Sequence, residues 1–206
     1  MKTKFISTKI KYDGTQLSPH FIYKNYEIMG DAIISFIGPC DVDLSEMVDI
    51  EDVVNNEPIY SEKMLHFICE IFNTDLVQGV YMQRLLVTTI KEQLETKYGK
   101  TLIRSGDDLF VGNGKLSVSI ATKSPTSVLI HTALNIITDN TPVKTSGLSS
   151  DLNICDIEKF ANEVLEAYSA EVKDIYLATT KVRGVVSCLL LITRKNHNKI
   201  NFYIFF

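Results

Sequence analysis

The sequence lacks a surplus of basic charge and has no long apolar run, and both absences exclude protein classes. Its 206 residues carry 21 Lys and Arg against 25 Asp and Glu, a formal net charge of −4. Nucleic-acid-binding domains usually carry a basic surplus, so we expect no nucleic-acid partner. No run of about 18 apolar residues occurs, so no membrane-spanning helix and no membrane partner are predicted. Because Met1–Tyr12 lacks the apolar stretch of a signal peptide, we expect a cytoplasmic protein.

Paired cysteines, repeats and common catalytic motifs are also absent. No CxxC pair occurs, and the cysteine spacing matches no zinc site. We therefore expect reduced and mostly buried thiols. No Walker, HExxH, GxSxG or GxGxxG motif is found. Gly and Pro are few and scattered, and no low-complexity linker divides the chain, so residues 1–184 are predicted to form one domain.

The pattern of apolar residues predicts an α+β fold. Strands are expected at 3–12, 20–28 and 31–37, followed by an irregular acidic segment over 38–60. Ser61 is a plausible N-cap for a helix, because Met64, Phe67, Ile68, Ile71 and Phe72 recur at helical spacing. Further helices are predicted at 76–98, with Gly99 as the C′ residue, and from about Asp156. Strands at 101–104, 108–112, 115–122 and 126–137 complete a mainly antiparallel sheet with helices packed on one face.

Residues 185–206 form an unusual terminal segment. Two apolar arms flank the polar stretch Arg194–Lys199. Each arm is too short to cross a bilayer as a helix, so we expect a β-hairpin or extension packed on the domain. If its apolar face were left uncovered, the segment would be a self-association site, and a homodimer stays open.

The informative block runs from Arg104 to Ile120. A strand carries Asp107 and Asp108 towards a glycine-framed turn, and Lys115 follows that turn. A lysine in such a place can act as a point charge on a carboxylate or phosphate. Small polar Ser117 and Ser119 alternate with apolar neighbours, so their face either leaves room for a ligand lying on the sheet or meets solvent.

This block resembles the core of the biotin- and lipoate-protein ligases. The resemblance rests on Gly106–Phe110, Lys115–Ile120 and Ile130–Ile136. It implies the fold shared with class II aminoacyl-tRNA synthetases. It also implies that Lys115 contacts the carboxylate or acyl phosphate of a small acid, and that Asp108 lies near the nucleotide or its metal.

More specifically, the chain to about residue 183 resembles an archaeal family known as domain of unknown function 366. The features that carry this resemblance are Tyr12–Leu17, Gly38–Val42, Met47–Asp52, Met64–Phe67 and Gln83–Leu86.

The ligase resemblance implies ATP as a cofactor, but one loop departs from the ligase pattern. Those ligases carry a basic, glycine-rich loop before the first helix, as an adenylate requires. The matching stretch here, 37–43, is acidic and has one glycine. The phosphate-binding loop is therefore absent, and no cofactor is assigned.

Other side chains offer competing interpretations. On the predicted helix after Ser61, His66 and Glu70 would share a face. Together with the acidic loop they could hold magnesium, manganese or iron. The alternative is a solvated acidic loop and a pair on the helix surface. Arg84 either clamps an anionic ligand beside Lys115 or forms an interior salt bridge to Asp107, Asp108 or Glu70. His131 is either a structural histidine or a base or ligand, and it lies across from Lys115 if the strands pair.

Three functions follow from these observations. The leading hypothesis is a ligase-fold domain that binds a small carboxylate or acyl-nucleotide. If it is an enzyme, the reaction is acyl transfer, with Lys115 as the catalytic residue and with ligand-binding residues Arg84, Asp107, Asp108, Ser117, Ser119, His131 and Asn135. The second is a metal-dependent hydrolase or lyase using Asp49, Glu51, Asp52 and His66. The third is a non-enzymatic binding or assembly module that lost the phosphate-binding loop.

Overall fold

A computed structural model describes residues 1–56, 59–141 and 143–184 of the chain. The strands are β1 (Lys2–Ile6), β2 (Ala32–Val42), β3 (Ile59–Phe72), β4 (Ile103–Ser105), β5 (Asp108–Val111), β6 (Gly114–Lys115), β7 (Ser117–Lys123) and β8 (Ser127–Asn135). The helices are α1 (Phe21–Tyr26), the 3-10 helix η1 (Leu44–Glu46), α2 (Ile50–Asn55), α3 (Leu76–Tyr98) and α4 (Ile157–Thr180). The prediction for 185–206 lies outside the described residues.

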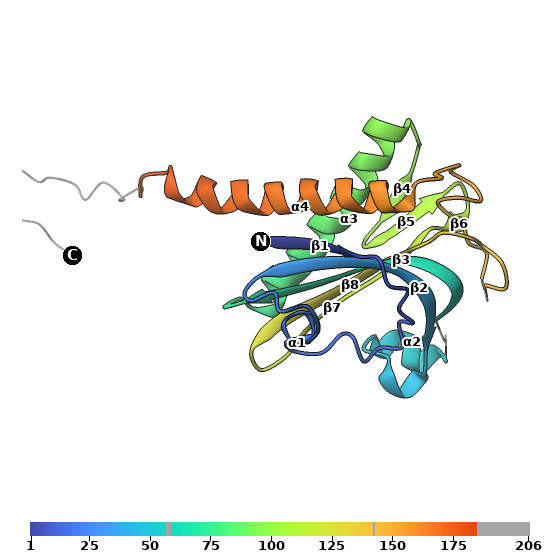
Figure 1. The fold of residues 1–206 in the computed structure, drawn as a ribbon, viewed down its shortest axis with the longest axis horizontal. Coiled ribbons are helices and arrows are strands. Elements are labelled where there is room, and N and C mark those ends of the chain that lie inside the picture. The colour runs from blue at the N-terminus through green and yellow to red at the C-terminus, as the bar shows by residue number, and fades with distance from the viewer. Residues whose placement is uncertain (57–58, 142, 185–206) are drawn as a thin grey trace, which may run out of the picture. The chain divides into compact units, whose positions relative to one another are not determined.

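The chain divides into two compact units, residues 1–173 and 174–206, and the sheets lie in the first. Its main sheet has the strand order β1-β2-β3-β8-β7 (Figure 1). The β1–β2 pair is parallel and the other pairs are antiparallel. A smaller antiparallel sheet contains β4, β5 and β6. The predicted α+β class with a mainly antiparallel sheet is confirmed.

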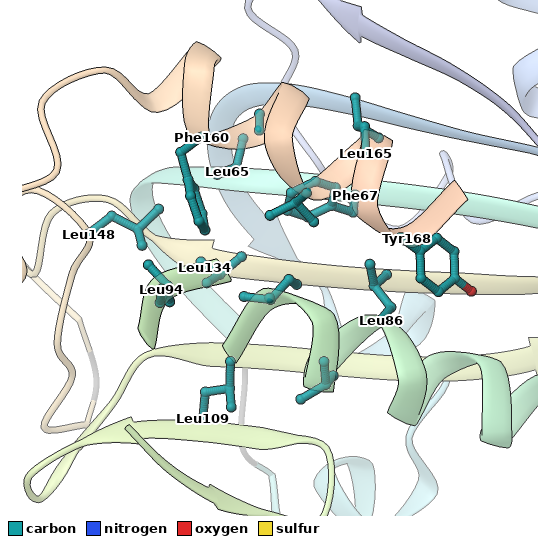
Figure 2. Close-up of a cluster of buried hydrophobic side chains, with 14 of the residues drawn as sticks. Leu65, Phe67, Leu86, Leu94, Leu109, Leu134, Leu148, Phe160, Leu165 and Tyr168 are labelled. Carbon is teal, nitrogen blue, oxygen red and sulfur yellow. The ribbon is translucent and has the colours of Figure 1, made fainter. Parts of the chain in front are cut away.

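One core lies between the main sheet and the two long helices. Leu86 and Leu94 of α3, Phe160 and Tyr168 of α4, and Phe67 of β3 are buried together there (Figure 2). Helix α3 begins and ends as the sequence predicts, and α4 begins where it was expected. Asp75 caps the N-terminus of α3 by accepting a hydrogen bond from the Gln78 N–H at 2.8 Å. Gly99 ends it in the left-handed conformation with φ 63°.

A second core lies on the opposite face of the sheet. There Tyr12, Ile22 of α1, Phe36 of β2, and Met64 and Ile68 of β3 are buried. Strand β3 therefore contributes to both cores, with Leu65, Phe67 and Cys69 on one face and Met64, His66 and Ile68 on the other. A strand buried on both faces reads as a continuous apolar run.

Three local predictions were wrong. The helix predicted after Ser61 is strand β3, because a continuous apolar run satisfies helical spacing as well. Residues 20–28 contain helix α1, which is flanked by His20 and Glu27 in the left-handed conformation. The acidic stretch 38–60 is not irregular throughout: it holds the end of β2, η1 and α2. Asp43 and Asp49 begin those two helices as N-caps, through the Ser45 and Glu51 N–H groups.

No helix in the described residues is both long enough and apolar enough to span a membrane.

Candidate functional site

A cavity of about 410 Å³ opens on the face of the sheet opposite the long helices. Its floor is formed by alternate side chains of the central and edge strands: Met64 of β3, Val118 and Ile120 of β7, and His131 and Asn135 of β8. Tyr12 and Leu17 of the N-terminal segment line one side. A second side is lined by Asp107, Asp108, Lys115, Val143 and Thr145. The lining also includes an acidic segment defined by Glu46, Asp49, Glu51 and Asp52.

The backbone of Lys115 is fixed at the cavity wall. The turn before it uses Gly112, whose φ of 57° is left-handed, as the tight hairpin prediction required. The Lys115 N–H donates to the Lys144 carbonyl at 3.1 Å, and its carbonyl accepts from the Ser146 N–H at 3.0 Å. That carbonyl also accepts a hydrogen bond from Asn135 Nδ2 at 3.3 Å. Asn135 therefore positions Lys115 through the main chain, while the lysine side chain lines the cavity.

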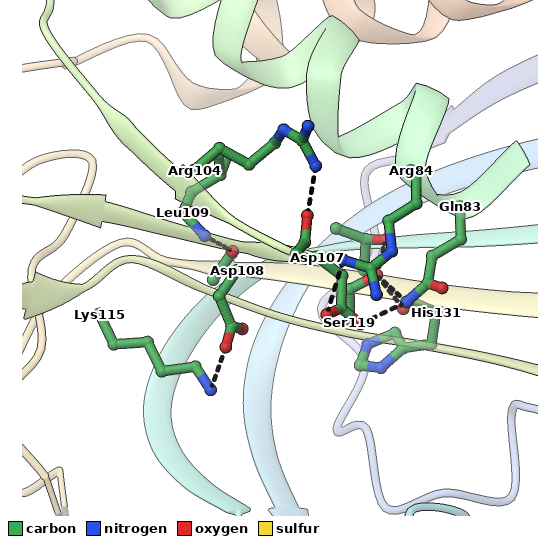
Figure 3. Close-up of polar contacts among 12 residues, drawn as sticks. Gln83, Arg84, Arg104, Asp107, Asp108, Leu109, Lys115, Ser119 and His131 are labelled. Atoms are coloured by element: carbon green, nitrogen blue, oxygen red, sulfur yellow. Dashed lines mark hydrogen bonds and ion pairs between the residues drawn. The ribbon is translucent and has the colours of Figure 1, made fainter. Parts of the chain in front are cut away.

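The ammonium of Lys115 pairs with Asp108. Lys115 Nζ lies 3.0 Å from Asp108 Oδ2, and the two side chains are 35% and 29% exposed (Figure 3). Burial raises the pKa of Asp108 above its ordinary value, although the hydrogen bond from Lys115 acts in the opposite direction. Asp108 is thus a carboxylate that accepts a proton more readily than a solvated one.

Asp107 belongs to a separate network with α3. Arg84 Nη1 lies 3.2 Å from Asp107 Oδ1, and Gln83 Nε2 donates to Asp107 Oδ2 at 2.7 Å. Gln83 also donates to Ser119 Oγ at 3.0 Å, and Ser119 Oγ lies 2.8 Å from Thr132 Oγ1. Figure 3 shows Arg84 and Gln83 converging on Asp107 and Ser119 from the helix. Arg84 is not among the residues that line the cavity, so the geometry matches the salt-bridge alternative for this residue.

The hydroxyls of the small polar face of β7 are bonded to β5, α3 and β8. Ser117 is fully buried, and its hydroxyl accepts a hydrogen bond from the Leu109 N–H at 2.9 Å. Ser117 does not line the cavity, while Ser119 borders it with its hydroxyl already bonded. The apolar face of β7 contributes Val118 and Ile120 to the cavity lining. The strand alternation was predicted correctly, but which face met the helix was not visible in the sequence.

The residues of the metal hypothesis are not brought together. Asp49, Glu51 and Asp52 line the cavity, whereas His66 is buried in the sheet. His66 Nε2 lies 3.2 Å from the Gly38 carbonyl, and its Nδ1 lies 3.1 Å from His131 Nε2. Within residues 1–56, 59–141 and 143–184, no group of three or more His, Cys, Asp or Glu side chains is arranged to hold a metal ion. The helix that was expected to align His66 with Glu70 is strand β3.

His131 lies on the cavity floor but not opposite Lys115. In the sheet register it pairs with Ile120 of β7 and Ile68 of β3. Tyr12, which sequence reasoning did not select, stacks on His131 with ring centroids 3.7 Å apart and an interplanar angle of 13°. Tyr12 is held there because its N–H donates to the Pro39 carbonyl at 2.9 Å and its carbonyl accepts from the Asp41 N–H at 3.0 Å. Only this pairing of distant segments identifies Tyr12, so no local sequence signal could have found it.

Burial sets the protonation of the two histidines. It lowers the pKa of His66 to about 4 and lowers the pKa of His131 well below its ordinary value, with His66 contributing to the latter. Both rings are therefore neutral near pH 7.

Comparison with known proteins identifies relatives of the whole first unit. The family model described as Domain of unknown function (DUF366) matches residues 1–183. Uncharacterized protein MJ0805 from Methanocaldococcus jannaschii is 35% identical over 181 residues, which cover 85% of this chain and 81% of that protein. A protein of unknown function from Pyrococcus horikoshi superposes with a TM-score of 0.83 at 36% identity, covering 90% of this chain and 99% of that one.

Two ligase structures are similar in fold at low identity. A mutant biotin protein ligase from Aquifex aeolicus, solved in complex with biotin, gives a TM-score of 0.57 at 12% identity over 85% of this chain and 71% of that one. A bi-partite lipoate protein ligase from Thermoplasma acidophilum gives 0.58 at 12% identity over 84% of each chain. The predicted biotin/lipoate ligase-like fold is thereby confirmed, and at this identity the likeness concerns the fold alone.

Proposed function

The chain belongs to the family described as Domain of unknown function (DUF366), as its motifs predicted, and we propose its function from the cavity. The cavity binds a small carboxylic acid with an apolar body, and the carboxylate lies beside Lys115. If the chain catalyses a reaction, it is acyl transfer, in which the Lys115 ammonium stabilises negative charge on the reacting oxygens.

One observation carries this proposal: a lysine with a fixed backbone stands at the wall of a cavity whose floor contains three apolar side chains. Lys115 lines the same cavity as Met64, Val118 and Ile120, and its Nζ lies 3.0 Å from Asp108 Oδ2. A volume of about 410 Å³ is within the range of small-molecule sites, which are mostly apolar with a few polar groups that fix orientation. An amphipathic acid matches that combination.

The charge of the lining favours a free acid over an acyl-nucleotide. Among the described residues that line the cavity, the acidic segment with Asp107 and Asp108 provides six carboxyl groups against one lysine. Phosphate groups need several positive or N–H donors, and Lys115 is the one Lys or Arg among the described residues of this lining. A single carboxylate beside Lys115 is accommodated because Asp108, with its raised pKa, can take up a proton. The ligase of the same fold that was solved with biotin holds a small acid of this kind.

Isothermal titration of the full chain with octanoate, lipoate, biotin and ATP tests the proposal. We expect at least one acid to bind and ATP not to bind. Lys115→Ala should weaken acid binding about 10- to 100-fold, since a hydrogen bond to a charged group contributes about 1.5–3 kcal/mol. Lys144→Ala is the matched control, because Lys144 is exposed, lies on the neighbouring segment and does not line the cavity.

Two results would contradict the proposal. The first is equal acid affinity for the wild-type chain and Lys115→Ala. The second is binding of ATP by a chain that binds none of the three acids, which would identify a nucleotide site instead.

A further inference from the structure

Four aromatic rings form a stack beneath the cavity. Tyr12 covers His131 with 3.7 Å between ring centroids, His131 lies 5.4 Å from His66 at 17°, and His66 lies 4.9 Å from Phe36 at 19°. Each of these residues is at least 95% buried. The rings are thus enclosed by their neighbours, and the hydrogen bonds at their edges have a fixed geometry.

These hydrogen bonds determine the tautomer of each histidine. The Gly38 carbonyl can only accept, so the neutral His66 ring must carry its proton on Nε2. His66 Nδ1 is then an acceptor, and His131 Nε2, 3.1 Å away, must donate to it. The proton of His131 is therefore on Nε2, and its Nδ1 keeps a lone pair.

The Gly38 end of this chain of hydrogen bonds cannot shift easily. A Cβ at position 38 would overlap the carbonyl oxygen of Ile10, which shows how closely the two backbones approach. The Ile10 N–H also donates to the Ile37 carbonyl at 3.2 Å. The carbonyl that orients His66 is therefore held by backbone packing.

His131 Nδ1 is open to the cavity. No residue in the described part of the chain donates a hydrogen bond to it. Because it is not among the fully buried side-chain atoms that lack a hydrogen-bond partner, this nitrogen is accessible. His131 lines the cavity, so a ligand there can reach this nitrogen. An unpaired acceptor in a buried site disfavours any ligand that cannot satisfy it.

We infer that His131 Nδ1 accepts a hydrogen bond from the end of the ligand remote from its carboxylate, and that His66 is the positioning residue that maintains this acceptor. Figure 3 shows His131 well separated from Lys115 and Asp108 along the strands. Asn135, which bonds the Lys115 backbone, is four residues from His131 on β8, or about 13 Å at the usual rise of a strand. The ligand class is therefore an elongated acid whose far end carries an O–H or N–H group. This inference rests on the proposed function for its ligand.

The first part of the test needs no ligand. Long-range ¹H–¹⁵N NMR of the histidine-labelled full chain at pH 7 reports which ring nitrogen carries the proton. We expect Nε2–H for both His66 and His131. His66→Phe should give His131 a mixture of tautomers, whereas His66→Gln, whose amide can also accept from His131, should restore the single one. A His131 ring protonated on Nδ1 in the wild-type chain would overturn the inference.

The second part compares octanoate with 8-hydroxyoctanoate, which differ in one terminal hydroxyl. We expect the hydroxy acid to bind about 3- to 10-fold more tightly to the wild-type chain, and to perturb the His131 Nδ1 resonance. His131→Phe, which retains the ring stack, should abolish the difference. Equal affinities in the wild-type chain overturn this inference but leave the small-acid function standing. Failure of both acids to bind overturns the ligand assignment, and the NMR experiment then still decides the tautomers.

Discussion

Lys115 Nζ lies 3.0 Å from Asp108 Oδ2, and burial raises the pKa of the Asp108 carboxyl group. Asp108 begins β5 and Lys115 ends β6, so the hairpin turn at Gly112 brings the pair together at the cavity wall. A ligand carboxylate that approaches Lys115 places a second negative charge beside Asp108. Like charges raise a carboxyl pKa further, so binding of a carboxylate beside Lys115 favours protonation of Asp108.

Octanoate binding should therefore take up a proton. The complex then holds one more proton than the free chain and free octanoate together. Affinity therefore falls as pH rises from 6 to 8, by up to about tenfold per pH unit for one proton. Asp108→Asn cannot be protonated in this way, and its affinity should be nearly constant over the same range. Titrations in buffers of different ionisation enthalpy measure the proton directly, and an identical apparent enthalpy in all buffers would disprove the coupling.

Gln83 should contribute more to stability than the neighbouring Arg84. Gln83 is 3% exposed and donates to both Asp107 and Ser119, so Gln83→Leu removes donors from two partly buried oxygens. We expect a loss of about 1–3 kcal/mol in the free energy of unfolding. The Arg84–Asp107 pair has side chains that are 37% and 29% exposed, and Arg84→Ala should cost at most about 1 kcal/mol. Urea unfolding of both variants measures the order, and a larger loss for Arg84→Ala would contradict this assignment.

Glu70 joins three segments of the second core through one oxygen. Its Oε1 accepts from the His20 N–H at 2.8 Å and from the Ser127 hydroxyl at 2.6 Å, and the residue is 2% exposed. Glu70→Gln keeps an acceptor oxygen and should cost about 1 kcal/mol, whereas Glu70→Ala leaves both donors unpaired and should cost about 3–5 kcal/mol. Thermal unfolding distinguishes the two variants, and equal losses would show that packing, not hydrogen bonding, is what Glu70 provides.

The long helices and the turn beside the site were predictable because local signals specify them. Asp75 and Gly99 mark the two ends of α3, and Gly112 marks the hairpin turn. Strand β3 was not predictable in the same way. Met64, Phe67 and Ile68 fit helical spacing, and only burial on both faces, which depends on α3, α4 and the N-terminal segment, makes that stretch a strand.

The arrangement of the candidate residues was predictable in part for the same reason. Lys115 and Asp108 lie in one hairpin, so the sequence placed them together. The stacking of Tyr12 on His131 joins residues that are 119 positions apart in the chain, and the facing of Ser117 and Ser119 depends on β5 and α3. Pairing between such distant segments is not encoded by local propensity.

The buried histidines should make the chain sensitive to acid. The pKa of His66 is lowered by burial from 6.5 to about 4. A lowered pKa means that the unfolded chain binds the proton first, so this contribution to stability is complete above pH 6.5 and is lost as pH falls towards 4. The loss for His66 amounts to about 3 kcal/mol at 1.36 kcal/mol per pKa unit.

His66→Phe should lower stability at pH 7, because His131 Nε2 loses its acceptor, yet flatten the decline between pH 6.5 and 4. His20→Asn, at a left-handed position that Asn tolerates, is the control and should keep the wild-type slope. Urea unfolding at half-unit pH steps measures the curves, and parallel curves for the wild-type chain and His66→Phe would refute the assignment.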